Sequence, residues 1–142
     1  MKVKIKRIDT ALPLPRYETD GSVAIDLYSR IDMEIPAKQV SLIPSNVIIQ
    51  TPPGYMFLVV TRSSTPKKLG LSVPHGIGII DQDYCGPDDE IHLQVYNFTD
   101  HTVKIEKGMR ICQGAFVRVD KAQFEEVEQM ENKTRGGFGS TG

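Results

Sequence analysis

Glycine and proline occur throughout this chain and divide it into short segments. The 142 residues include twelve glycines and nine prolines, and both residue types favour turns over long helices. The segments between the turns include β-branched stretches, as at Val40–Ile43 and Val47–Gln50. The sequence therefore predicts an all-β domain of many short strands, for which a sandwich, a barrel or a jelly roll would each fit.

Several other segments have the hydrophobic patterns of strands. Polar and apolar residues alternate along Lys2–Ile8 and Ile91–Tyr96, which indicates strands with one buried face. Tyr55–Val60 is a continuous apolar run of strand length, which indicates burial on both faces. Further strands are predicted at Val103–Ile105 and at residues 111–119.

Length and composition limit the class of protein. A chain of 142 residues is long enough for one domain with a buried core. Its net charge of −1 gives no basic field for nucleic acid, and no apolar run approaches membrane-spanning length. Cys85 and Cys112 could pair, but without a signal peptide we expect free thiols in a reducing compartment. These features predict a cytoplasmic protein that binds neither nucleic acid nor a membrane.

Asp26 is a carboxylate inside the short apolar run Val23–Ser29. An aspartate among apolar neighbours must be paired, hydrated or close to a cation. Alternatively, Asp26 points to the solvent-facing side of a strand. The sequence leaves both interpretations open.

The stretch Thr61–Gly70 has the signals of one helical turn. Hydroxyl residues precede Pro66, and Gly70 follows the last position. A helix N-terminus beside serines and Arg62 would suit an anion. An ordinary capped helix with a surface arginine fits equally well.

The stretch Gly76–Gly86 carries Asp81 directly after two isoleucines. A packed, β-prone wall could hold this carboxylate in fixed geometry as a general base. A β-hairpin whose turn contains Asp and Gly is the simpler interpretation, and the stretch taken by itself favours it.

The C-terminal segment changes in composition. Ala122–Met130 fits either a last strand or a short amphipathic helix, whereas residues 132–142 contain four glycines and cannot form a core. We expect a domain over residues 1–130 and a flexible arm over residues 131–142. The phenylalanine of the arm, Phe138, would stack on a flat ligand or pack on a neighbouring subunit.

Five stretches together resemble, in order and spacing, the trimeric dUTP pyrophosphatase (dUTPase) family. One such motif would be a weak signal, but five in sequence are specific, and they cover essentially the whole chain. They are Ala24–Ser29, Arg62–Ser64, Gly78–Gly86, Gly108–Gln113 and Gly136–Gly142.

The resemblance implies a jelly-roll β-barrel with one short helix, assembled as a homotrimer with active sites at the subunit interfaces. The arm would close over a neighbour's site. The implied reaction is hydrolysis of dUTP to dUMP and diphosphate, with Mg²⁺ on the triphosphate.

The resemblance also implies roles for individual residues. Asp81 would be the general base that deprotonates the water attacking the α-phosphorus, and Asp26 would orient waters on Mg²⁺. Tyr84 would pack under the sugar and exclude a ribose 2′-hydroxyl. The other implied contacts are uracil recognition by the main chain of Gly78, Ile79 and Ile80 and by His75, phosphate binding by Arg62, Ser63, Ser64 and Gln113, and closure by Phe138 on the uracil ring, with Gly139 next to it and Ser140 and Thr141 near the phosphates.

The chain departs from the family pattern in four places. Met109 stands where Asp is frequent, and His75 stands where Asn is common. Pro87–Asp89 looks like an insertion that lengthens the hairpin of the third stretch, and we expect its acidic residues to form a solvated turn. In the arm, either Lys133 or Arg135 would meet the γ-phosphate. We favour Arg135 because a guanidinium grips phosphate through two hydrogen bonds.

Two alternatives remain at this stage. A dCTP deaminase, alone or with dUTPase activity, shares the barrel, but the Asp81–Tyr84 pairing and the full glycine-rich arm favour uracil. A non-enzymatic β-barrel could bind RNA through Arg135–Gly137, although one such triplet on a nearly neutral protein is a weak signal.

Overall fold

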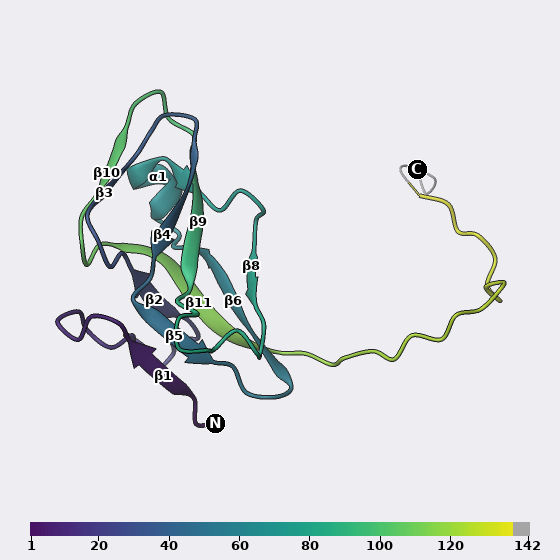
Figure 1. The fold of residues 1–142 in the computed structure, drawn as a ribbon. Coiled ribbons are helices and arrows are strands. Elements are labelled where there is room, and N and C mark those ends of the chain that lie inside the picture. Colours follow the sequence, from purple (N-terminus) through teal and green to yellow (C-terminus); the bar gives the residue numbers. More distant parts are fainter. Residues whose placement is uncertain (138–142) are drawn as a thin grey trace.

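The computed structural model describes residues 1–137 of the chain. Within them the protein forms eleven short strands and one helix (Figure 1). In chain order these are β1 (Lys4–Arg7), β2 (Ile25–Tyr28), β3 (Met33–Ile35), β4 (Val40–Pro44), β5 (Val47–Gln50), β6 (Tyr55–Thr61), α1 (Thr65–Leu69), β7 (Leu71–Ser72), β8 (Gly78–Ile80), β9 (His92–Asn97), β10 (Val103–Ile105) and β11 (Arg110–Arg118).

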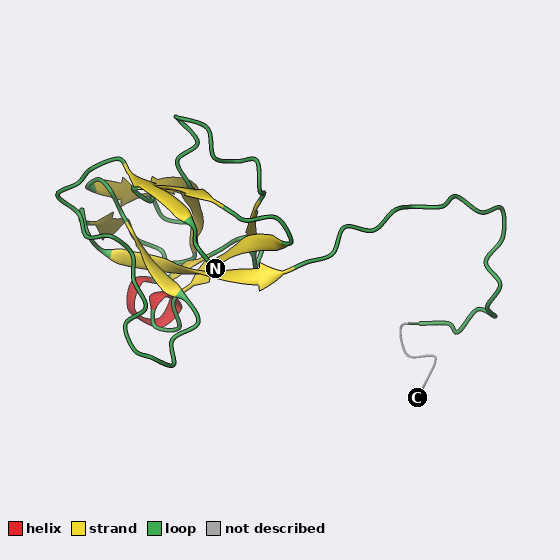
Figure 2. Ribbon diagram, turned by 90° about the horizontal axis from the view of Figure 1, so that it is seen from below, coloured by secondary structure: helices red, strands yellow, loops and turns green. Residues whose placement is uncertain are grey.

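The strands pair in small antiparallel sheets around a common core (Figure 2). The largest sheet has the order β2-β11-β6-β8, and a second has the order β4-β9-β7. β1 pairs with β5, and β3 pairs with β10. The predicted strand-rich class is therefore confirmed, and the four-stranded sheet provides the frame for most of the candidate site residues.

β6 shows how the core is filled. Phe57 and Val59 point inward and are buried, whereas Leu58 and Val60 on the other face are half-buried. The prediction that this strand is buried on both faces is therefore wrong for the single chain. Gly114 on neighbouring β11 makes room for Phe57, since a Cβ there would lie 2.1 Å from the Phe57 ring.

The predicted helical turn is present as α1. Pro66 lies in its first turn, and Gly70 ends it with a φ of 66°, a conformation that glycine adopts without strain. Ser64 precedes the helix but makes no capping hydrogen bond through its side chain. Instead, the Thr65 hydroxyl donates to the carbonyl of Ile111 at 2.8 Å and fastens the turn to β11.

After β11 the chain leaves the body of the protein, as Figure 1 shows. Residues 120–137 form neither strand nor helix and are exposed, and Phe124 is 98% exposed. The prediction of a strand or helix at Ala122–Met130 is therefore wrong, because the apolar side chains of this segment remain unburied by the rest of the chain. No helix within residues 1–137 has the length and apolar character needed to span a membrane.

Candidate active site

Asp26 lies on β2 and forms ion pairs with two arginines. Its Oδ1 is 2.7 Å from Arg62 Nε at the end of β6, and its Oδ2 is 3.0 Å from Arg110 Nη1 on β11. The Asp26 side chain is only 11% exposed. Of the two interpretations that the sequence left open, the paired carboxylate is therefore the observed one.

A pocket of about 230 Å³ lies beside these arginines. Arg62, Lys68 and Arg110 bring three cationic side chains to its lining, and Ser64 and Thr65 add hydroxyls. Such a lining favours an anion with several oxygens, such as a phosphate chain. Because α1 is a single turn, the side chains rather than a helix dipole supply most of the positive charge here.

Two other predicted phosphate ligands lie near the Asp26 ion pairs. Gln113 on β11 stands opposite Asp26 in the strand register, and Ser63 is exposed in the turn before α1. The fold therefore brings the first, second and fourth family-like stretches together.

Sequence reasoning assigned no role to Lys68 or Arg110, although both line this pocket. Lys68 lies one helical turn after Ser64, and its N–H donates to the Ser64 carbonyl at 2.9 Å. That spacing within a helical segment was a signal that could have revealed Lys68.

The third stretch lies at the opposite edge of the same sheet. β8 pairs with β6, so Gly78, Ile79 and Ile80 follow the edge, and Ile79 is 60% exposed. Asp81 follows β8 and is exposed. Within the described part of the chain its carboxylate makes no hydrogen bond and no ion pair. Asp81 lines a pocket of about 440 Å³ together with Tyr55, Met56, Gln82, Asp83, Val119 and Lys121.

Tyr84 is held by its hydroxyl group, which donates to the carbonyl of Glu90 at 3.1 Å. The residue is 39% exposed, so the phenol is tied down while part of the ring remains open to solvent. The Gln82 side chain donates to the carbonyl of Tyr55 at 2.8 Å and anchors the same loop to β6.

His75 lies in the turn before β8, where Gly76 has a φ of 78°. The imidazole Nε2 is 3.6 Å from the position that a Cβ of Gly78 would occupy. The His75 ring therefore lies close to the backbone that is predicted to read uracil.

Asp26 and Asp81 lie far apart in one chain. Their strands are three strand spacings apart in the sheet, which is about 14 Å. In the register, Asp26 aligns with Val60 of β6 through β11, and Asp81 aligns with Met56, one position beyond the last β6–β8 pair. This offset of four residues adds about 13 Å along the strands and gives a separation of roughly 19 Å.

The departures from the family pattern have simple structural forms. Met109 is half-buried and packs against the core. At the insertion, the Asp89 carboxylate accepts a hydrogen bond from the Gly86 N–H at 2.6 Å, and Asp88 is exposed. No group of three or more potential metal-binding side chains occurs within residues 1–137. Pro87 and Asp88 form a turn.

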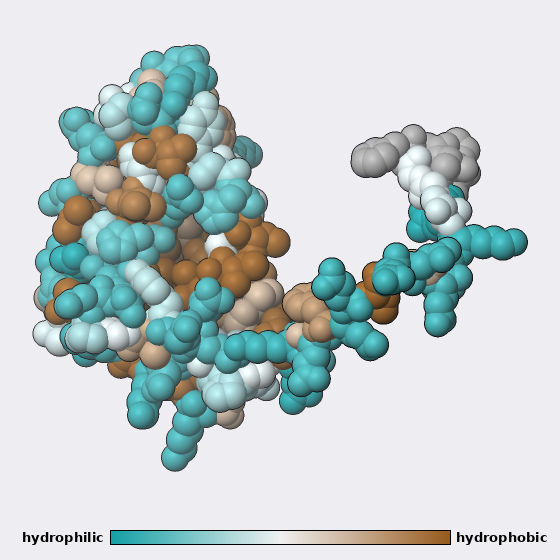
Figure 3. All heavy atoms as spheres, turned by 45° about the vertical axis from the view of Figure 1, so that its right-hand side comes forward, coloured by the Kyte–Doolittle hydropathy of each residue, from teal (hydrophilic) through white to brown (hydrophobic). Residues whose placement is uncertain are grey.

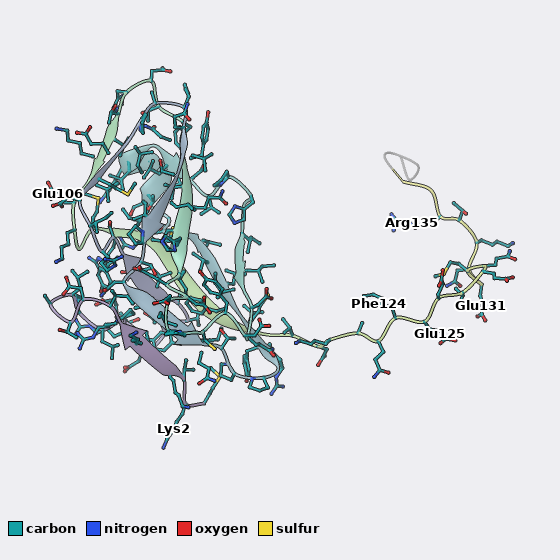
Figure 4. All side chains as sticks on the ribbon, viewed as in Figure 1. Lys2, Glu106, Phe124, Glu125, Glu131 and Arg135 are labelled. Carbon is teal, nitrogen blue, oxygen red and sulfur yellow. The ribbon has the colours of Figure 1, made fainter. Side chains whose placement is uncertain are left out.

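The remaining predicted contacts lie in the C-terminal segment. Lys133 and Arg135 are exposed, and Figure 4 shows Arg135 well away from the body together with Phe124 and Glu131. Phe138, Gly139 and Ser140 lie outside the described residues.

The fold and these side chains define a small all-β protein with a cationic pocket at one edge of a sheet and an open carboxylate at the other edge. A family model described as dUTPase matches residues 10–142. The chain belongs to the dUTPase family, as its five stretches predicted.

Curated relatives match along the full length. The chain is 43% identical to a deoxyuridine 5′-triphosphate nucleotidohydrolase of Dictyoglomus turgidum, over 100% of this chain and 99% of that protein. It is 36% identical to the protein of the same name from Helicobacter pylori, over 100% and 97%. The predicted family, and with it the enzyme class of dUTP diphosphatases, is confirmed.

Solved structures agree with the fold. The crystal structure of a Streptococcus mutans dUTPase superposes with a TM-score of 0.77 at 32% identity, over 84% of this chain and 98% of that chain. A Staphylococcus bacteriophage 80alpha dUTPase with dUPNHPP gives a TM-score of 0.86 at 22% identity, over 99% and 98%. The predicted jelly-roll class is confirmed.

Proposed function

We propose that this protein hydrolyses dUTP to dUMP and diphosphate. The observation that carries the proposal is full-length similarity, at 43% identity, to a relative named for this reaction. Removal of dUTP would limit the incorporation of uracil into DNA, and the dUMP would serve dTTP synthesis.

Asp81 acts as the general base in this proposal. Its carboxylate is exposed and free of hydrogen bonds and ion pairs within the described residues, so it can accept a proton from a water molecule. The water then attacks the α-phosphorus in line with the leaving diphosphate. Proton transfer to a well-placed carboxylate typically contributes about 10²- to 10⁴-fold to a rate.

The cationic pocket holds the phosphates. Arg62 and Arg110 supply positive charge, and Ser63, Ser64 and Gln113 supply uncharged donors near it. Phosphoryl transfer depends mainly on such positioning and charge stabilisation. Arg62 forms its ion pair with Asp26 through Nε, which leaves the terminal nitrogens of its guanidinium to donate to a phosphate oxygen.

Asp26 fits a role in binding hydrated Mg²⁺. Both of its oxygens already lie in ion pairs with arginine, which disfavours direct coordination, but each retains a lone pair for a water molecule. Mg²⁺ usually keeps several of its waters in protein sites. When bound, the ion would neutralise charge on the triphosphate.

The substrate site is shared between subunits of a homotrimer. Asp26 is paired with two of the arginines that line the phosphate pocket, whereas Asp81 as general base must lie within one water molecule of the α-phosphorus of the same bound nucleotide. A separation of roughly 19 Å between Asp26 and Asp81 in one chain is too large for that arrangement. We therefore infer that Asp81 of one subunit faces Asp26 of another.

Exposed apolar surface supports this assembly. Figure 3 shows apolar side chains gathered on the side of the body from which the C-terminal segment leaves. Ile77, directly before the edge strand β8, is 49% exposed, and Ile79 in β8 is 60% exposed. Apolar patches of this kind favour burial against another protein surface.

The segment from His75 to Tyr84 selects the base and the sugar of the substrate. The main chain of Gly78–Ile80, with His75 beside it, reads the uracil edge, and the ring of Tyr84 excludes a 2′-hydroxyl by its bulk. Phe138, Gly139 and Ser140 close over the bound nucleotide, and Arg135 meets the γ-phosphate. Closure of such an arm excludes water from the site.

The direct test is diphosphate release from dUTP, UTP, dCTP and dTTP, with and without Mg²⁺. We expect release from dUTP with Mg²⁺ and little from the other three nucleotides. Ammonia release from dCTP would instead indicate a deaminase. Salt-dependent RNA binding without any diphosphate release would indicate a binding protein.

A mixing experiment tests the shared site. Asp26→Asn and Asp81→Asn variants are assayed separately and after joint refolding. If each site takes one aspartate from each of two subunits, random mixing restores about a quarter of wild-type activity. If both aspartates serve one site within a chain, mixing two inactive variants restores nothing.

A further inference from the structure

Glu90 lies near the end of the loop that carries Asp81 and Tyr84, and its side chain is held by several hydrogen bonds. Arg30 Nε donates to Oε1 and Arg30 Nη2 donates to Oε2, both at 2.8 Å. The backbone N–H of Asn46 donates to Oε1 at 2.7 Å. Because the Glu90 side chain is only 9% exposed, this paired arginine–carboxylate contact is held in one geometry.

The groups that clamp Glu90 are themselves fixed. Asn46 is buried with a φ of 71°, and its side chain accepts from the Asp9 N–H at 2.6 Å and donates to the Asp9 carbonyl at 3.0 Å. The Arg30 N–H donates to the carbonyl of Pro44 at 2.8 Å. The clamp therefore rests on backbone that the core holds in place.

The electrostatics agree with this geometry. Burial alone raises the pKa of Glu90, but the hydrogen bonds from Arg30 and Asn46 outweigh it and lower the pKa below its ordinary value of 4.5. The same contact with Glu90 raises the pKa of Arg30. Both groups are therefore charged across the neutral pH range.

The backbone carbonyl of the same residue holds the phenol of Tyr84. This oxygen accepts from the Tyr84 hydroxyl at 3.1 Å and lies 2.9 Å from Nδ1 of His92. The neighbouring turn, Pro87–Asp88, is exposed. The bond to the Glu90 carbonyl therefore ties the Tyr84 ring to a residue whose side chain the core holds in place.

We propose that Arg30 and Glu90 are positioning residues for Tyr84 that set the selectivity for deoxyribose. By fixing the Glu90 carbonyl they fix the phenol, and the phenol fixes how closely the ring approaches the sugar. Selectivity by bulk requires the ring to stay within about 0.5 Å of its place. This inference rests on the proposed hydrolysis of dUTP.

The test compares selectivity with overall activity. kcat/KM is measured for dUTP and UTP in the wild type, Glu90→Gln, Tyr84→Phe and the double variant. Glu90→Gln keeps the shape of the side chain and removes its charge, and Tyr84→Phe removes only the bond to the Glu90 carbonyl. We expect each single variant to lower the dUTP:UTP ratio about ten- to a hundredfold, with no further fall in the double variant.

A matched control separates positioning from general damage. Glu34 on β3 lies 3.7 Å from Lys104 in an exposed ion pair, so Glu34→Gln removes an equivalent charge away from Tyr84. It should leave the ratio unchanged. A structural defect lowers both kcat/KM values together and also leaves the ratio unchanged.

An unchanged ratio in Glu90→Gln, or independent and multiplicative effects in the double variant, would overturn the inference. If Glu90→Gln does not fold, Arg30→Lys, which keeps the charge but loses the paired geometry, is measured in its place with the same criteria. A wild type that does not hydrolyse dUTP would overturn the proposed function itself. If the wild type prefers dUTP over UTP and the variants lower both kcat/KM values without changing their ratio, only the role of Arg30 and Glu90 is overturned.

Discussion

Asp26 and Asp81 have similar local sequence contexts, but Asp26 lies on one edge strand of a sheet and Asp81 directly after the opposite edge strand of the same sheet. Each follows an isoleucine within an apolar stretch. Asp26 is 11% exposed in its side chain and is bound by Arg62 and Arg110. Asp81 is exposed, and in the described chain its carboxylate is unpaired.

The difference separates two kinds of half-site. The Asp26 side is complete within one chain, because β2, β11 and the end of β6 supply both the carboxylate and its cations. The Asp81 side presents a free carboxylate at a sheet edge. In the proposed function, the first half holds phosphates and the second supplies the base, so substitutions in the two halves should have different consequences.

The largest expected effect is on turnover in Asp81→Asn. We expect a loss of about 10²- to 10⁴-fold in kcat because the general base is removed. Binding of a non-hydrolysable dUTP analogue and the free energy of unfolding should remain nearly as in the wild type, the latter within about 0.5 kcal/mol. Diphosphate release, calorimetric binding and urea unfolding measure the three quantities. An unchanged kcat would remove Asp81 from the mechanism.

Deletion of residues 131–142 should have the next largest effect. Residues 131–137 are exposed, so folding and assembly should be preserved. The lost closure should lower kcat/KM for dUTP about tenfold or more. Light scattering and diphosphate release test both parts. A truncated protein with full activity would show that closure by the arm contributes nothing.

Asp26→Asn should affect stability, unlike Asp81→Asn. The substitution leaves two arginines without their charged partner, which should cost about 1–3 kcal/mol in the free energy of unfolding. Urea unfolding measures the cost, with Asp81→Asn as the control of identical chemistry at an unpaired site. Equal free energies of unfolding in the two variants would contradict the distinction between a paired Asp26 and an unpaired Asp81.

Glu90 extends the comparison to acid stability. Its pKa is lowered in the folded protein, so folding favours the ionised form. This contribution is complete above the ordinary value of 4.5 and is lost as the pH falls through the lower folded value. Urea unfolding below about pH 5 should therefore show a steeper loss of stability in the wild type than in Glu90→Gln. Parallel curves would contradict this.

The smallest expected difference concerns the two thiols. Burial raises the pKa of Cys112 on β11 to about 12, whereas Cys85 in the hairpin is half-buried. Iodoacetamide should therefore modify Cys85 in the native protein and Cys112 only after unfolding, since the thiolate is the reactive form. Peptide mass spectrometry identifies the modified residue, and Cys85→Ser is the control.

The sequence determined the local structure of this protein. Alternation along Ile91–Tyr96 predicted the strand that is observed at His92–Asn97, and Pro66 with Gly70 predicted the helical turn observed as α1. Both predictions succeeded because backbone preference and side-chain period depend on adjacent residues. The five stretches were sufficient to predict the family. The strand or helix predicted at Ala122–Met130 failed because its apolar residues need a surface that the chain itself does not provide.

The tertiary structure decided which charges are paired. Arg110 meets Asp26 across 84 residues of sequence, and Arg30 meets Glu90 across 60. Neither contact can be read from neighbouring residues, because each depends on how strands and loops distant in the sequence are brought together in space. The same sheet order places Asp81 at the edge far from Asp26, so that within the described residues one carboxylate is paired with two arginines and the other is unpaired.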